Sequence, residues 1–151
     1  MNCSENNDII AILKSSTKKT QKFTLEGCVK LCKVVDVYDG DTCRVVFNHN
    51  GQINKWNIRM TGYDSPEMRP SKSLPNRDEI KAKAKESKSY LKSLICSNDE
   101  QLVYLKCGGF DKYGRLLGEI YVNQNDEESV NNIMIKDGYA YEYHGGTKKK
   151  N

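Results

Sequence analysis

The segment VVDVYDGDTCRVVFNHNGQINKWNIRM, residues 34–60, decides the fold of this chain. Most of it consists of β-branched and apolar residues, which favour strands. Two pairs interrupt it, Asp39-Gly40 and Asn50-Gly51, and such pairs favour two-residue hairpin turns. Beyond the second pair, apolar and polar residues alternate from Ile53 to Met60, as in a strand with one buried face. The segment therefore predicts a meander of three antiparallel strands.

Outside this meander, the period of the apolar residues separates helices from strands. Between Asp78 and Cys96 apolar residues recur at helical spacing, and most lysines lie elsewhere on the helix. The remaining expected elements are strands at about 101–107 and 115–122, a short helix at 129–137 and a last strand at 139–143. Five strands with a helix inserted after the third, and a second short helix, predict an α+β fold, mainly β. The expected architecture is a five-stranded barrel of the oligonucleotide-binding (OB-fold) type.

The length of 151 residues fits one domain. Residues 1–21 are rich in Asn, Ser, Thr and Lys, which predicts a flexible N-terminal arm with one helical turn around Ile9 to Leu13. The barrel domain is expected over residues 22–144, followed by a basic tail at 145–151.

Composition favours a soluble protein, because no apolar stretch approaches the ~20 residues that cross a bilayer. Acidic Glu5 and Asp8 precede the apolar run near the N-terminus, so a signal peptide is not expected. We therefore expect an intracellular location, without distinguishing cytoplasm from nucleus. Six cysteines occur without a metal-binding spacing, and we expect free, mostly buried thiols.

The 24 basic residues exceed the 20 acidic ones by a formal charge of +4, which only mildly favours a polyanionic partner. Lysines crowd residues 14–22, residues 81–92 and the C-terminal end. For each run the interpretation as solvated surface is favoured.

Acidic residues follow two of the expected strands. Asp41 closes the first hairpin and Asp64 follows the third strand, so a barrel could bring both carboxylates to one rim, where they would share a hard cation. The backbone carbonyl of Ser65 could add a third oxygen. Such a sparse set leaves positions for water and a phosphate, and Glu67, beside it, could act as a general base.

Two arginines and one turn supply positive charge for the same chemistry. Arg59 faces away from the apolar side of the third strand, and Arg115 follows the turn that ends at Gly114. Guanidinium groups stay charged and bind phosphate oxygens in a forked geometry. Lys112 and Tyr113, in the same turn, could contact a terminal phosphate.

Each of these motifs alone also has a purely structural interpretation. Asp39-Gly40 can be a hairpin turn, residues 64–67 an N-cap or turn, and Arg59 with Glu67 a surface ion pair. The two histidines, His49 and His144, are interpreted as surface residues without a catalytic role.

Taken together, residues 39–42, 59–67 and 111–115 resemble the staphylococcal (thermonuclease-like) nuclease family in order and approximate spacing. The resemblance runs from about Val29 to Tyr143. It implies an OB-fold barrel with Ca²⁺-dependent endonuclease and exonuclease activity on DNA and RNA, single-stranded or unwound, leaving 3′-phosphates and 5′-hydroxyls. By position, the resemblance assigns the calcium carboxylates to Asp41 and Asp64, a carbonyl ligand to Ser65, catalysis to Arg59, Glu67 and Arg115, and nucleotide-phosphate contacts to Lys112 and Tyr113.

The sequence also departs from the family pattern. Secreted relatives continue into a third, C-terminal helix, whereas we expect no helix in the Gly-Gly and lysine residues that follow Tyr143. One hypothesis is that the N-terminal arm, through its apolar run, covers part of the surface that such a helix would bury. The family's base-stacking tyrosine pair aligns poorly with Tyr141, Tyr143 and His144. The alternatives to an active nuclease are a catalytically inactive member of the family that only binds nucleic acid, and an OB-fold protein-interaction module.

Overall fold

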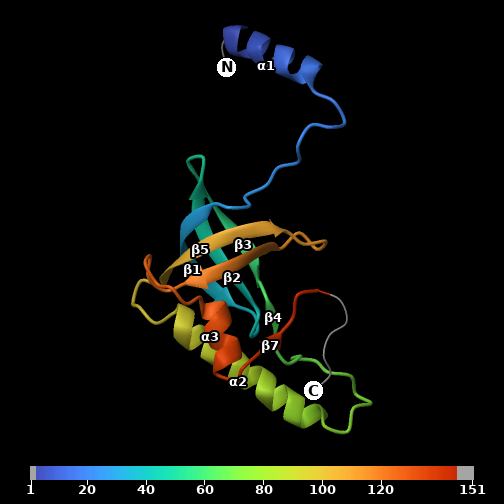
Figure 1. The fold of residues 1–151 in the computed structure, drawn as a ribbon, viewed down its shortest axis with the longest axis vertical. Helices are drawn as coiled ribbons and strands as arrows, with labels where there is room; N and C mark the ends of the chain where they lie inside the picture. Colours follow the sequence, from blue (N-terminus) through green and yellow to red (C-terminus); the bar gives the residue numbers. More distant parts are fainter. Residues whose placement is uncertain (1–2, 146–151) are drawn as a thin grey trace.

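A computed structural model describes residues 3–145 of the chain, with side chains from residue 5 onward. The predicted basic tail therefore lies outside the described residues except for Gly145. The predicted fold class is confirmed: the structure is a closed five-stranded β-barrel with three helices (Figure 1).

The barrel order is β1-β2-β3-β6-β5. Its strands are β1 (Val29–Val37), β2 (Thr42–His49), β3 (Gln52–Met60), β5 (Leu102–Phe110) and β6 (Leu116–Tyr121). β1, β2 and β3 form the expected antiparallel meander. Asn50 and Gly51 both have positive φ angles, 52° and 84°, between the paired residues His49 and Gln52, so this two-residue hairpin is confirmed.

The first hairpin differs from its prediction. The β1–β2 ladder ends at the pair Val37 and Cys43, so the connection is longer than two residues. The Asp39 side chain accepts a hydrogen bond from Asp41 N at 3.0 Å, and Gly40 is not among the glycines with positive φ. A type I′ turn needs positive φ at both central residues, whereas here an aspartate side chain organises the loop.

The barrel closes through one parallel contact between strands distant in sequence. β3 pairs parallel with β6, from Ile58 beside Leu116 to Met60 beside Gly118, and β5 pairs antiparallel with both β1 and β6. The inward side chains of these strands, including Val45, Ile58, Leu105 and Ile120, are fully buried and form the core. Closure leaves the two rims of the barrel as the places where loops converge.

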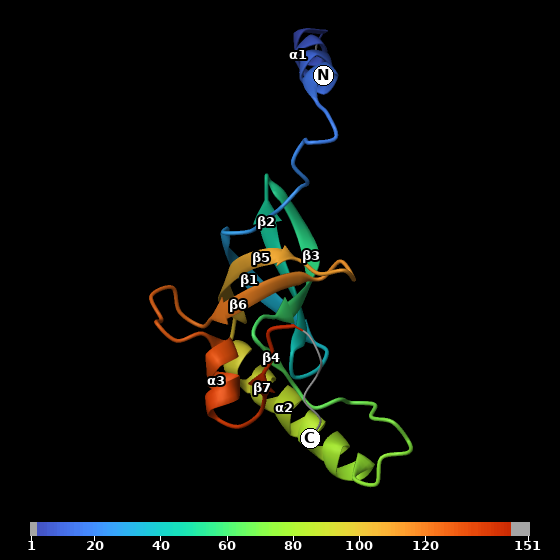
Figure 2. The same ribbon diagram turned by 45° about the vertical axis from the view of Figure 1, so that its right-hand side comes forward.

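Two helices pack beneath one end of the barrel, as Figures 1 and 2 show: α2 (Arg77–Ile95) and α3 (Val130–Lys136). α2 buries Ala84, Ser87, Leu91 and Ile95, which agrees with the predicted apolar face except that Ser87 was not expected there. Ser129 caps α3 by accepting a hydrogen bond from Asn132 N, and Gly138 follows with φ of 84°.

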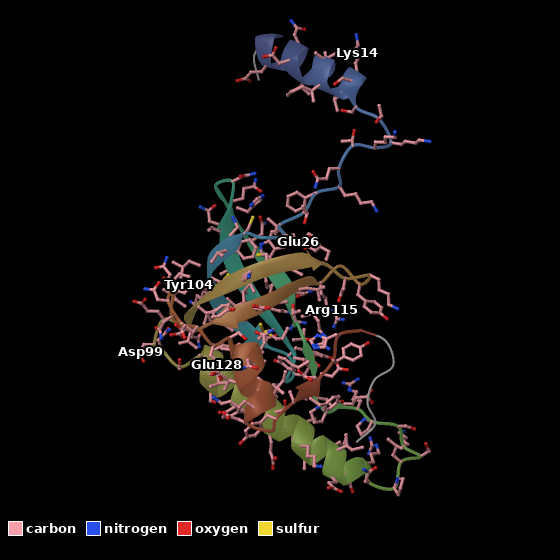
Figure 3. The ribbon with its side chains drawn as sticks, viewed as in Figure 1. Lys14, Glu26, Asp99, Tyr104, Arg115 and Glu128 are labelled. Carbon is pink, nitrogen blue, oxygen red and sulfur yellow. The ribbon has the colours of Figure 1, made fainter. Side chains whose placement is uncertain are left out.

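The N-terminal helix is longer than predicted. α1 spans Cys3–Ser15, with acidic Glu5 in its first turn and basic Lys14 in its last, an arrangement that favours the helix dipole. In Figures 1 and 3, α1 with Lys14 stands apart from the barrel. Ile9, Ile10, Ile12 and Leu13 are 43–65% exposed, so this apolar run does not cover the barrel, contrary to the hypothesis drawn from the sequence. Instead Leu25, after the extended segment, is buried in the core.

Three of the five cysteines whose side chains the structure describes are buried, and all five are free: Cys28, Cys32, Cys43, Cys96 and Cys107. Burial raises the pKa of the Cys32 thiol to about 12 and that of Cys107 to about 11, so both stay protonated and behave as small apolar groups. Within the described part of the chain, every helix is too short or too polar to cross a membrane.

Candidate active site

Loops from one rim of the barrel, together with Lys88 of α2, line a cleft of about 870 Å³. All eight residues that the sequence singled out lie in its lining: Asp41, Arg59, Asp64, Ser65, Glu67, Lys112, Tyr113 and Arg115. They come from the β1–β2 loop, the end of β3, the segment around β4 (Tyr63–Asp64) and the β5–β6 turn. Barrel closure thus brings three separated stretches of sequence to one site.

Arg59 joins the two carboxylates that were predicted to share a cation. Its Nη1 atom lies 3.4 Å from Asp41 Oδ2, and its Nη2 atom forms an ion pair with Asp64 Oδ1. Nη1 also donates hydrogen bonds to the carbonyls of Met60 and Tyr63 at 3.0 and 2.9 Å. The guanidinium is therefore fixed against the rim, with only 11% of its side chain exposed. Both of these ion pairs are made within the cleft.

The Asp41 carboxylate is held on both of its oxygens. Thr42 Oγ1 donates to Oδ1 at 3.0 Å, and Ser65 donates to Oδ2 through both its backbone N and its Oγ at 3.1 Å. Burial opposes ionisation of this carboxyl, but Arg59 and the hydrogen bonds from its neighbours outweigh burial and hold its pKa below the usual value. Asp41 is therefore charged and oriented at neutral pH.

Asp39, which was predicted only to form part of a turn, also lines the cleft. Burial, and then the neighbouring Asp41 charge, raise the pKa of Asp39 to about 6. As the pH falls, Asp39 therefore takes up a proton before Asp41 does.

A buried tyrosine supports the loop that carries these two acids. Tyr63 is fully buried, and its hydroxyl donates to the carbonyl of Gly40 at 2.7 Å. A Cβ atom at Gly40 would lie 2.6 Å from Ser65 Cβ and closer still to Ser87 Oγ, so only glycine fits between the loop and α2. Sequence reasoning missed this contact because its partners lie far along the chain.

β4 positions Asp64 by pairing with β7 (Tyr141–Glu142), so the last predicted strand is confirmed in a short form. Asp64 is opposite Tyr141 and fully buried, and Tyr143 N donates to the carbonyl of Gly62 at 3.0 Å. Tyr143 itself lines the cleft. The C-terminal segment therefore braces the strand that carries one of the two central carboxylates.

The β5–β6 turn presents Arg115 through Asp111, a residue that the sequence analysis did not single out. Asp111 Oδ1 accepts hydrogen bonds from the backbone N atoms of Tyr113 and Arg115, each at 2.9 Å. Its Oδ2 contacts Arg115 Nε at 2.7 Å. Figure 3 shows Arg115 beside this turn, on the flank of the barrel. An aspartate at the start of a turn that ends in Gly114 was the available signal.

The remaining predicted residues lie at the mouth of the cleft. Glu67 is exposed, one residue beyond Pro66. Tyr113 is 72% exposed, and its ring centroid lies 5.2 Å from Lys112 Nζ and 5.4 Å from Arg115 Cζ. The turn therefore offers an aromatic face and two positive charges together.

The family model described as "Staphylococcal nuclease homologue" matches residues 57–151, which is more than half of the chain. The chain belongs to the staphylococcal nuclease family. The matched residues begin within β3 and include seven of the eight predicted site residues; Asp41 precedes them.

Curated relatives of this nuclease-family chain carry endonuclease names. Endonuclease YncB of Bacillus subtilis (strain 168) is 33% identical over 113 residues, and the SPbeta prophage-derived endonuclease YokF of the same organism is also 33% identical over 113 residues. An uncharacterized endonuclease of Escherichia coli is 29% identical over 111 residues. These matches cover 73–74% of this chain but only 48%, 34% and 60% of the respective relatives.

Proposed function

We propose that this chain is a nuclease that hydrolyses phosphodiester bonds of DNA and RNA in a calcium-dependent reaction. One observation carries the proposal: three cleft carboxylates, Asp41, Asp64 and Glu67, share a single cleft with the guanidinium groups of Arg59 and Arg115. Family membership and the endonuclease names of the relatives support the same reaction class. A binding module without catalysis would not need this combination of acids and arginines.

The donor set fits a hard cation. Asp41 and Asp64 would hold the calcium ion, with the Ser65 backbone carbonyl as a third ligand, and all three donors are oxygens. Among the described residues no three His, Cys, Asp or Glu side chains gather into a metal site, so the protein would supply few ligands. Calcium tolerates such an irregular shell completed by water and phosphate, whereas magnesium demands a nearly ideal octahedron. When bound, the cation would add positive charge at the non-bridging phosphate oxygens.

Three side chains are assigned the proton transfer and the stabilisation of the phosphoryl group. Glu67 would accept a proton from the attacking water, whose oxygen forms the new bond to phosphorus. Arg59 and Arg115 would donate hydrogen bonds to the phosphoryl oxygens as their negative charge grows. The bond from phosphorus to the 5′ oxygen then breaks, and that oxygen takes a proton from solvent. The products are a 3′-phosphate and a 5′-hydroxyl.

The exposed aromatic and basic groups at the mouth favour single-stranded or unwound substrates. The ring of Tyr113 can stack on an unpaired base, and Lys112 beside it can bind a phosphate. A base in a duplex is already stacked and paired, so this contact favours separated strands. We propose both internal and terminal cleavage for this site.

The test is cleavage of an end-labelled single-stranded 20-mer, as DNA and as RNA, with calcium titrated from zero. We expect cleavage that a chelator abolishes, that Arg115→Ala reduces by at least about a hundredfold, and that leaves 3′-phosphate ends. A protein that binds the 20-mer but never cuts it would overturn the proposal in favour of an inactive binding member of the family.

A further inference from the structure

A second groove adjoins the cleft and is not used by the proposed chemistry. Its volume is about 240 Å³, and it lies between β1 and the C-terminal half of α2. Asp36, Val37 and Lys88 line both the cleft and this groove, so the two lie side by side. Its far end is lined by Lys92, Cys96 and Gln101.

The groove is positively charged along its helical wall. Lys88 and Lys92 are one helical turn apart on α2, about 6 Å along the axis, and both line the groove. Among the described residues in its lining Asp36 is the one acid, and it forms an ion pair with Arg44 across the β1–β2 ladder. The acid is thereby neutralised, and the two lysine charges determine the polarity of the groove.

An exposed aromatic side chain lies where the cleft meets this groove. Tyr38 follows the shared residues Asp36 and Val37, lines the cleft and is 53% exposed. The guanidinium of Arg44 lies 5.5 Å from the centroid of its ring and braces it. A ring followed by a row of lysines is the combination that binds single strands, because bases stack on the ring and phosphates pair with the lysines.

We propose that the groove along Lys88 and Lys92 is an extended binding track for a single-stranded polynucleotide whose neighbouring linkage occupies the cleft. This inference rests on the proposed function and goes beyond it, because it makes substrate length a determinant of affinity. The lysine run at 81–92 is then partly a binding surface. From the sequence, the favoured interpretation of the whole run was solvated surface. We therefore expect a trinucleotide seated in the cleft to depend less on Lys92 than a longer strand does.

Binding without cleavage tests the track separately from catalysis. Fluorescence anisotropy in chelator gives the affinity of a labelled, unstructured 20-mer and of a labelled trinucleotide for the wild-type chain and for Lys88→Gln/Lys92→Gln. We expect the double variant to weaken 20-mer binding much more than trinucleotide binding. We also expect the slope of log affinity against log salt for the 20-mer to fall by about 1.4, that is about 0.7 for each lost phosphate contact.

Two further variants serve as controls. Lys83→Gln/Lys106→Gln removes the same amount of charge from α2 and β5, at residues that line neither the cleft nor the groove. It should leave the ratio of the 20-mer affinity to the trinucleotide affinity unchanged. Lys88→Arg/Lys92→Arg keeps the charge and should retain 20-mer binding. Thermal melting of each variant checks that it folds.

The outcomes separate the two proposals. A 20-mer affinity and salt slope that match the wild type in folded Lys88→Gln/Lys92→Gln would overturn the track, even if the protein cuts. An equal loss of 20-mer affinity in Lys83→Gln/Lys106→Gln would also overturn the track, since only the net charge of the protein would then matter. Selective loss of 20-mer binding, in a protein that cuts no substrate, would support the track and overturn the proposed nuclease activity.

Discussion

The carboxylate of Asp111 contacts Nε of Arg115 at 2.7 Å and also accepts hydrogen bonds from the turn backbone. Asp111 therefore positions an arginine that is proposed to stabilise the transition state. We predict that Asp111→Ala lowers kcat by about ten- to a hundredfold, because a displaced group loses most of its effect. Steady-state cleavage of the single-stranded 20-mer measures this change.

A double-mutant cycle shows whether Asp111 acts through Arg115. In an Arg115→Ala background, Asp111→Ala should cost little further activity, because the group it positions is already gone. Multiplicative losses in kcat would contradict the positioning role.

The contact between Asp111 and Arg115 also predicts how the stability of the fold depends on pH. Burial opposes ionisation of Asp111, but hydrogen bonds from Arg115 and Tyr113 outweigh it and lower its pKa below the ordinary value of 3.8. A carboxyl with a lowered folded-state pKa stabilises the fold above its unfolded pKa and loses this contribution as pH falls through the folded-state pKa. The difference in unfolding free energy between wild type and Asp111→Asn should be constant above about pH 5 and shrink below pH 4. A difference that grows on acidification would contradict this sign.

A substitution at Gly40 tests how closely the β1–β2 loop, which carries Asp39 and Asp41, packs against α2. A Cβ atom there would lie 2.6 Å from Ser65 Cβ, so Gly40→Ala should destabilise the protein by about 1–3 kcal/mol and lower its melting temperature. The matched control is Gly109→Ala, because a Cβ at Gly109 meets nothing within 4 Å and its φ is not positive. Equal melting temperatures for the two variants would show that the loop does not pack as described.

The hydroxyl of Tyr63 makes a buried hydrogen bond to the Gly40 carbonyl at 2.7 Å. Tyr63→Phe leaves that carbonyl without this partner and should cost about 1–3 kcal/mol in urea unfolding. Tyr121→Phe removes a hydroxyl that bonds the Glu119 side chain at 3.0 Å in a partly exposed position, and it should cost less. A larger loss for Tyr121→Phe would contradict the supporting role of Tyr63.

Local chemistry made much of the fold predictable. The Asn50-Gly51 turn, the amphipathic helix α2 and the short helix α3 each depend on residues close in sequence, and each was predicted and found. The parallel β3–β6 contact and the packing of Gly40 against Ser87 join distant residues, so no local pattern indicates them. The same reason explains why Asp39-Gly40 was assigned the wrong turn.

The candidate site was predictable for a different reason. Its acids and arginines lie at strand ends, and a barrel gathers strand ends at its rims. All eight residues consequently reach one cleft. Asp111 and Lys88 were missed, because the first acts through a turn and the second faces the cleft only once α2 is docked.

The most direct test of the account measures calcium binding and cleavage on the same variants. Calorimetric titration should show that Asp41→Asn and Asp64→Asn lose calcium affinity and cleavage together. Arg115→Ala should keep calcium affinity and lose cleavage, because its side chain acts on phosphate and not on the metal. Calcium affinity that survives both aspartate substitutions, or cleavage that proceeds unchanged in chelator, would contradict the central claim that these acids and arginines form one metal-dependent nuclease site.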